Sequence, residues 1–183
     1  MRALLKKLGR SWLWLLFLLD SNDYVSGIND YDYIHDDQVA WYAKQVKKME
    51  KEEGGHVSSL LFLHMLLEQY KTANNLYEAG SPKVKYFFGE NKEKMIDKVC
   101  FSKYPSKLFD TAKKSGSSKA MFCGHGHYNN MSVEYEGIRL TYGMSIDYLA
   151  MPGIDKETER RGATLITVHE DSSYDIKQVA YRK

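Results

Sequence analysis

The chain has 183 residues, of which 43% are hydrophobic and 27% charged, and 26 basic against 24 acidic side chains give a net charge of +2. This composition is typical of a globular domain and argues against disorder. The near balance of charge argues against a nucleic-acid partner, which usually requires a clustered basic face. Cys100 and Cys123 lie in apolar segments without a Cys-x-x-Cys pattern, so reduced thiols and one disulfide both remain open.

The N-terminal segment has two interpretations. A basic stretch within residues 1–10 precedes an unbroken apolar run at 12–19, the order found in signal peptides, but no small-residue cleavage pattern follows. The run is too short to span a bilayer, so no membrane partner is expected. A buried strand over residues 13–19 is the favoured interpretation. Localisation stays open between cytoplasmic and secreted.

The next segments predict a loop, a helix and a second strand. Residues 20–32 are rich in Asn, Asp, Ser and Gly and predict a loop. A helix is expected to begin at Asp36 or Asp37, which suit an N-cap, and to end at the glycine pair 54–55. The short apolar run at 57–64 predicts another buried strand.

The second half of the chain predicts fewer helices and more strands. Residues 65–77 predict an irregular polar segment, with a partly helical one as the alternative. We expect a long loop at 80–94, a helix at 106–115 and a strand at 119–123. Residues 132–142 predict a half-exposed strand or a hairpin, and 163–181 a terminal hairpin. Early alternation of strands and helices with a strand-rich end indicates an α/β or layered α+β domain. The matched apolar character of 13–19, 60–62 and 120–123 predicts adjacent strands of one sheet.

Three histidines stand at the ends of predicted strands. His125 and His127 flank one glycine directly after a strand, and side chains two residues apart in an extended segment point the same way. His64 ends the preceding apolar strand. Neutral imidazole is the commonest protein metal ligand, although an isolated His-Gly-His is also compatible with a surface turn. The remaining histidines that we expect at the surface or in loops are His35, His56 and His169.

The histidine segments resemble those of a known family. LLFLH at 60–64 and MFCGHGHYNN at 121–130 resemble calcineurin-like metallophosphoesterases, in which a strand ending in His precedes a strand ending in GHxH by roughly 60 residues. Weaker similarity to the purple-acid-phosphatase-like branch lies in LLFLLDSNDY, YDYIHDDQVAWYAKQ, YEGIRLTYGM and RRGATLITV, at 15–24, 31–45, 135–144 and 160–168. The resemblance implies an α/β fold: the C-terminal half of a two-sheet β-sandwich flanked by helices.

The resemblance also implies a site. Members hold two metal ions, of Fe, Zn or Mn, and hydrolyse phosphate esters, here with acid-phosphatase-like character. By the family pattern His64 and His125 would bind the second metal and His127 the first, while no catalytic residue is assigned. Residues 15–183 would form the C-terminal part of the domain, and 1–14 a divergent start.

The chain departs from the family pattern in its first half. Asp-x-His, Gly-Asp and Gly-Asn-His, which supply the bridging aspartate and an asparagine ligand, are absent from the sequence. We therefore expect a truncated chain with little activity alone, and a missing N-terminal half as a candidate partner beside the phosphate ester substrate. The alternatives left open are a non-catalytic fragment and a secreted binding module with a residual histidine metal site.

Overall fold

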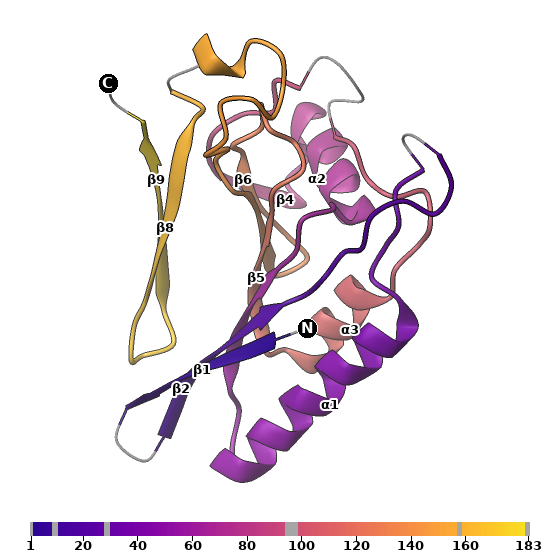
Figure 1. The fold of residues 1–183 in the computed structure, drawn as a ribbon. Coiled ribbons are helices and arrows are strands. Elements are labelled where there is room, and N and C mark those ends of the chain that lie inside the picture. The colour runs from indigo at the N-terminus through magenta and orange to yellow at the C-terminus, as the bar shows by residue number, and fades with distance from the viewer. Residues whose placement is uncertain (1, 9–10, 28–29, 94–98, 157–158, 182–183) are drawn as a thin grey trace.

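The chain folds into three layers. The computed structural model describes residues 2–8, 11–27, 30–93, 99–156 and 159–181, with side chains from residue 14 onward. A seven-stranded sheet stands in the middle, with three helices on one face and the β8–β9 hairpin on the other (Figure 1).

The central sheet is mixed. Its strands run in the order β1-β2-β3-β5-β7-β6-β4. Their bounds are Arg2–Leu8 for β1, Ser11–Leu18 for β2, Ser58–Phe62 for β3, Val84–Phe88 for β4, Ser118–Cys123 for β5, Ser132–Tyr135 for β6 and Ile138–Tyr142 for β7. The four central strands, β2, β3, β5 and β7, are parallel, with Leu60 opposite both Leu16 and Ala120. The prediction that the three apolar runs form adjacent strands is confirmed.

The helices cover one face of this sheet. They are α1 at Asp36–Glu53, α2 at Glu68–Glu78 and α3 at Leu108–Ser115, and a 3-10 turn, η1, occupies Ile154–Lys156. The N-cap of α1 is His35, one residue before the expected aspartates, and its backbone N–H donates to Gln38 Oε1 at 2.8 Å. Asp36 and Asp37 lie instead in the first turn, where negative charge favours the helix dipole.

Both faces of the central strands are buried, which explains their continuous apolar sequence. On the helical face the main core includes Phe17, Leu61 and Met121, all fully buried. Alternate residues form a smaller cluster on the opposite face, Trp14, Leu60, Ala120 and Phe122. The hairpin of β8 (Gly162–Val168) and β9 (Tyr174–Ala180) packs on that cluster with every second residue.

One sequence-based expectation is wrong, because the expected loop at 80–94 contains β4. For 65–77 the alternative of a partly helical segment is confirmed, because α2 lies there. The apolar stripe of α2 is short, because its buried residues are only Tyr70, Ala73 and Asn74. β4 is an edge strand with one buried residue, so its sequence lacks a clear core pattern, and pairing with β6 defines it.

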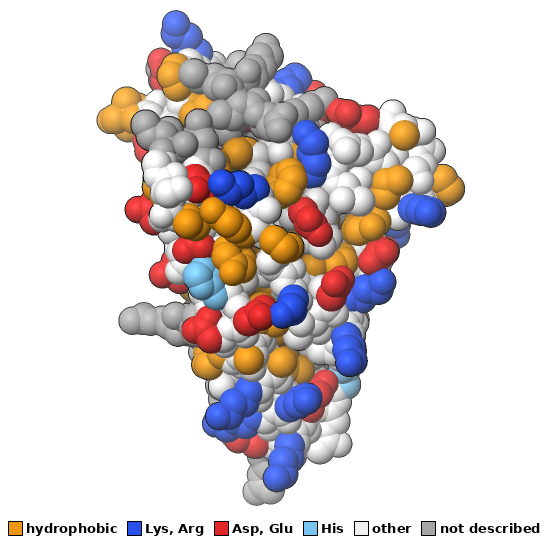
Figure 2. Space-filling model, turned by 90° about the vertical axis from the view of Figure 1, so that its right-hand side faces the viewer, with side chains coloured by type: hydrophobic (Ala, Val, Ile, Leu, Met, Phe, Trp, Pro, Cys, Tyr) orange, Lys and Arg blue, Asp and Glu red, His pale blue; other side chains and the backbone are white. Residues whose placement is uncertain are grey.

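The expectation of an α/β fold with helices beside a sheet is confirmed, and the sheet is mixed. The second sheet contains two strands, β8 and β9, in the part of the chain that the structure describes. On the face shown in Figure 2, basic and acidic side chains are interspersed. Among the described residues, no helix has the length and apolar character needed to cross a membrane.

Candidate metal centre

The loops that carry His64 and His125 leave the same edge of the sheet. They follow β3 and β5, which are parallel neighbours, so their carboxyl ends lie side by side. The two loops are also tied directly, because the backbone N–H groups of Gly124 and His125 both donate to His64 O, at 3.2 and 3.1 Å. As a result His64 Nε2 and His125 Nδ1 face each other at 3.2 Å.

His127 completes the histidine cluster, as we name His64, His125 and His127. Its ring centroid lies 6.4 Å from that of His64 and 6.3 Å from that of His125. Gly126 allows this tight loop, because a Cβ there would meet Asn129 Nδ2 at 2.6 Å. The structure thus brings together the three histidines that the sequence singled out.

The environment keeps two of these imidazoles neutral. Partial burial, followed by the neighbouring His64 and His127, lowers the pKa of His125 from 6.5 to about 4. Although His64 is exposed as a whole, burial of part of its ring and then His127 lower its pKa too. In addition, His125 Nε2 and His127 Nδ1 are buried nitrogens without a hydrogen-bond partner among the described residues. Neutral imidazole is the form that binds metal.

The facing nitrogens fit two ligand positions on one metal ion. Zinc binds histidine nitrogen at about 2.0–2.1 Å in tetrahedral sites, which separates two ligand nitrogens by about 3.3 Å. The observed 3.2 Å between His64 Nε2 and His125 Nδ1 matches that separation. Within the described ranges, no three His, Cys, Asp or Glu side chains are arranged around one ion position. The geometry therefore supports two ligands, His64 and His125, for one ion, and His127 is not a third ligand of that ion.

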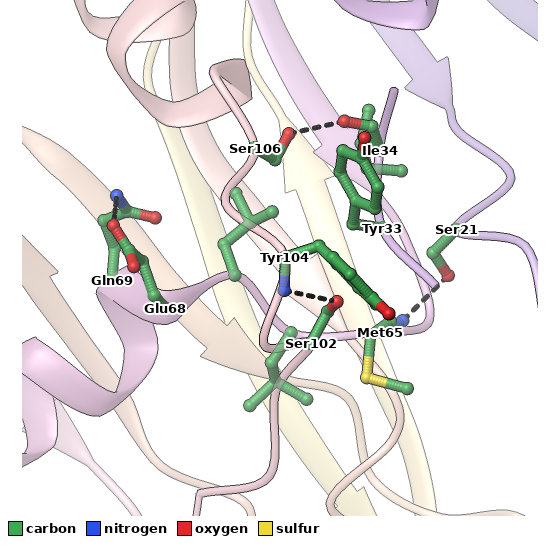
Figure 3. Close-up of a pocket in the computed structure, with 11 residues that line it drawn as sticks. Ser21, Tyr33, Ile34, Met65, Glu68, Gln69, Ser102, Tyr104 and Ser106 are labelled. Carbon is green, nitrogen blue, oxygen red and sulfur yellow. Dashed lines mark hydrogen bonds between the residues drawn. The ribbon is translucent and has the colours of Figure 1, made fainter. Parts of the chain in front are cut away.

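Ser21 holds the backbone of the His64 loop. Its hydroxyl oxygen accepts the N–H groups of His64 at 3.2 Å and Met65 at 2.8 Å. Figure 3 shows Ser21 reaching Met65 at the wall of a small cavity of about 10 Å³, which Tyr33 and Tyr104 also line. Ser21 follows β2, so three neighbouring strands contribute to this edge.

Two asparagines anchor the loop after the histidines. Asn129 is 1% exposed, and its Oδ1 accepts the N–H groups of Lys92 at 2.9 Å and Glu93 at 3.0 Å. Asn130 Oδ1 accepts the N–H of Glu90 at 2.9 Å, and the Asn130 N–H donates to Glu90 O at 3.1 Å. Sequence reasoning missed this role, because asparagine is common in turns and no local pattern links residues 129–130 to 90–93.

Arg160 is a second supporting residue that the sequence did not reveal. Its side chain is 8% exposed; it donates to Tyr128 O at 3.0 Å and forms an ion pair with Glu90. It therefore joins the segment after β7 to the loop immediately following His127.

The other three histidines pair with carboxylates. His35 Nε2 lies 2.7 Å from Asp32, His56 Nδ1 lies 3.3 Å from Glu50, and His169 Nε2 lies 2.8 Å from Asp175. Each of these rings therefore has a carboxylate partner, whereas His125 Nε2 and His127 Nδ1 have no hydrogen-bond partner among the described residues.

Comparison with known proteins gives one structural likeness. No family model matches the sequence, and no curated protein is found as a relative. The crystal structure of a dimetal phosphatase from Danio rerio is similar over 62% of this chain and 27% of that one, with 12% identity and a TM-score of 0.38. The chain thus corresponds to about a quarter of that phosphatase's length.

Proposed function

We propose that this chain carries histidine ligands of a dimetal phosphoesterase centre, with His64 and His125 on one ion and His127 on its neighbour. The observation that carries the proposal is the 3.2 Å separation of His64 Nε2 and His125 Nδ1 in imidazoles held neutral by their surroundings. The resemblance of the two strand-histidine segments to calcineurin-like metallophosphoesterases supplies the substrate class, a phosphate ester.

The three imidazole donors favour some metal ions over others. Imidazole suits zinc and iron, whereas manganese favours oxygen ligands. When two ions are bound, their charge stabilises the attacking and leaving oxygens of a displacement at phosphorus. The chain's own contribution is to bring the neutral rings of His64 and His125 together and to hold their loops in place through Ser21 and Asn129.

The charge of the cluster limits what the chain does alone. Three imidazoles supply no negative charge, so they do not offset the repulsion between two cations a few ångströms apart. We therefore propose that the chain alone holds one ion at His64 and His125 and hydrolyses phosphate esters slowly. The same all-imidazole donor set favours a second candidate function, a non-catalytic metal-binding module.

Zinc titration by calorimetry tests the ligand assignment. We expect the wild type to bind one zinc ion per chain. Loss of a residue that only supports a metal ligand lowers metal affinity about 10-fold or more, so loss of the ligand itself in His125→Ala should weaken zinc binding by at least about 10-fold. The matched control is His169→Ala, which removes a histidine that already has Asp175 as partner and should leave zinc affinity unchanged. Equal zinc binding by the wild type and His125→Ala contradicts the proposal.

Hydrolysis of an aryl phosphate by the zinc-, iron- or manganese-loaded chain separates the two functions. We expect turnover well below about 1 per second, the lower end for typical enzymes. Turnover at or above that rate, lost in His125→Ala, would show that carboxylates such as Asp20, Asp23 or Glu68 complete the centre.

A further inference from the structure

The second nitrogen of the His125 ring lacks the partner that a metal-binding histidine usually has. His125 Nδ1 faces His64 Nε2 at 3.2 Å, whereas His125 Nε2 is buried without a hydrogen-bond partner among the described residues. A ligand histidine almost always donates its other N–H to a carboxylate, a carbonyl or water, and this hydrogen bond fixes the ring orientation. Because the second side-chain torsion of histidine is otherwise broad, a different contact is needed to keep Nδ1 directed at His64.

The ring of Tyr31 makes such a contact. Its centroid lies 4.6 Å from that of His125, and the two rings meet edge to face at 71°. This distance is shorter than the 5.2 Å and 6.3 Å that separate the His125 ring from those of His64 and His127. Edge-to-face packing is a favoured arrangement of aromatic rings, and a turn of the His125 ring would disrupt it.

The position of Tyr31 does not depend on the two histidine loops. Tyr31 forms an antiparallel bridge with Tyr24, and its carbonyl oxygen accepts a hydrogen bond from Ser102 Oγ at 2.8 Å. Its side chain is 9% exposed, so neighbouring groups restrict the ring. Tyr31 therefore belongs to a third segment, between β2 and α1, that contacts the histidine cluster in addition to the loops after β3 and β5.

We propose that Tyr31 is a positioning residue that orients the His125 ring, so that Nδ1 is directed at the metal position shared with His64; this inference rests on the proposed function. The ring contact takes the place of the hydrogen bond that usually orients a ligand histidine. It requires the aromatic face of Tyr31 but not the hydroxyl group, because ring packing carries it. Tyr31 thereby reduces the entropy that His125 loses when an ion binds.

Calorimetric zinc titration of two Tyr31 variants tests this role. Tyr31→Phe keeps the ring and should bind zinc as the wild type does. Tyr31→Leu keeps apolar bulk without an aromatic face and should bind zinc about 10-fold more weakly, the effect of losing a residue that orients a metal ligand. The matched control is Tyr33→Leu, which removes a tyrosine that stacks on His35 with centroids 4.4 Å apart and should leave zinc affinity unchanged.

A double-mutant cycle distinguishes positioning from general support of the fold. If Tyr31 acts through His125, Tyr31→Leu should not weaken zinc binding further in the His125→Ala background. A loss of about 10-fold in both backgrounds means that Tyr31 only supports the fold and overturns the inference. An equal loss in Tyr31→Phe and Tyr31→Leu also overturns it, because the hydroxyl would then be the group that matters.

NMR of the wild type separates this inference from the proposed function. Nuclear Overhauser contacts between the Tyr31 and His125 rings should fit one orientation of His125 without metal, and zinc should not change it. Several orientations without metal, or a new one with zinc, overturn the inference even when Tyr31→Leu does not fold.

The remaining outcomes are also distinct. Zinc binding that depends on His125 but is equal in the wild type and Tyr31→Leu overturns the inference and leaves the proposed function standing. Absence of zinc binding removes the function, and the NMR of the metal-free protein then decides whether Tyr31 orients the ring.

Discussion

The two ends of β3 and β5 differ in how their clusters of polar side chains are hydrogen-bonded. At the amino ends lies a hydroxyl cluster whose members all have hydrogen-bond partners; they are Tyr42, Ser59, Ser117 and Ser118. The Tyr42 hydroxyl bonds Ser118 Oγ at 2.8 Å, and Ser59 Oγ lies 2.9 Å from both Ser117 Oγ and Ser118 Oγ. At the carboxyl ends lies the histidine cluster, where two buried nitrogens lack a partner among the described residues.

The difference separates a structural polar cluster from a candidate binding site. A closed hydrogen-bond network stabilises the fold and leaves no capacity for a ligand. An unpartnered atom alone is not decisive, because Ser58 Oγ is also buried without a partner in the described part of the chain. What distinguishes the histidine cluster is that several nitrogens converge and that burial keeps two of the rings neutral.

The largest expected effect lies in the loop that supports the histidines. Gly89 has φ of 77°, and a Cβ there would meet Asn130 O at 2.1 Å. We expect Gly89→Ala to destabilise the fold by about 3 kcal/mol, through overpacking against backbone and a left-handed conformation. Gly137→Ala is the control: it shares a positive φ of 83° but meets nothing within 4 Å, and should cost about 1 kcal/mol in urea unfolding. Equal losses would mean that the Asn130 contact is unimportant.

Asn129→Ala tests the hydrogen bonds that join the loop after His127 to residues 92–93. It leaves the part-buried N–H of Lys92 and the buried N–H of Glu93 without their acceptor, which should cost about 2–3 kcal/mol. If Asn129 also positions His127, zinc affinity at the cluster should fall about 10-fold. Asn75→Ala, at an exposed position of α2, is the control and should change neither quantity. Full zinc affinity in a destabilised Asn129→Ala protein would limit its role to folding.

The neutral histidine predicts a pH dependence of stability. Because the pKa of His125 is about 4 in the folded chain against 6.5 for an ordinary histidine, only the unfolded chain gains this proton between those values. Stability should therefore fall as the pH is lowered from 6.5 towards 4, by about 1–2 kcal/mol after allowance for partial exposure. Urea unfolding at both ends of this range, compared with His125→Asn, isolates the contribution. The same slope in both proteins would contradict it.

The hydroxyl cluster should give the smallest effect and none on metal binding. Tyr42→Phe removes hydrogen bonds to Ser115 and Ser118 and should cost about 1 kcal/mol in thermal or urea unfolding. Zinc affinity should be unchanged, because the cluster lies at the opposite strand ends. A lower zinc affinity in Tyr42→Phe would mean that the hydroxyl cluster also affects metal binding at the histidine cluster.

The sequence predicted the central strands and the histidine edge because both depend on local patterns. Continuous apolar runs define strands that are buried on both faces, and His64 and His125 directly follow such runs. It failed for β4, whose edge position depends on pairing with β6. It left α2 open between an irregular and a partly helical segment, because the buried face of α2 is short. The anchors Asn129 and Arg160 also escaped, since their partners lie tens of residues away in the chain.

Anomalous diffraction from zinc-soaked crystals would show whether the histidine cluster holds metal. We expect a zinc peak within about 2.0–2.1 Å of His64 Nε2 and His125 Nδ1, the usual zinc–histidine distance. A protein that binds zinc only at His35, His56 or His169, or leaves His64 and His125 joined by a direct hydrogen bond at saturating zinc, would contradict it.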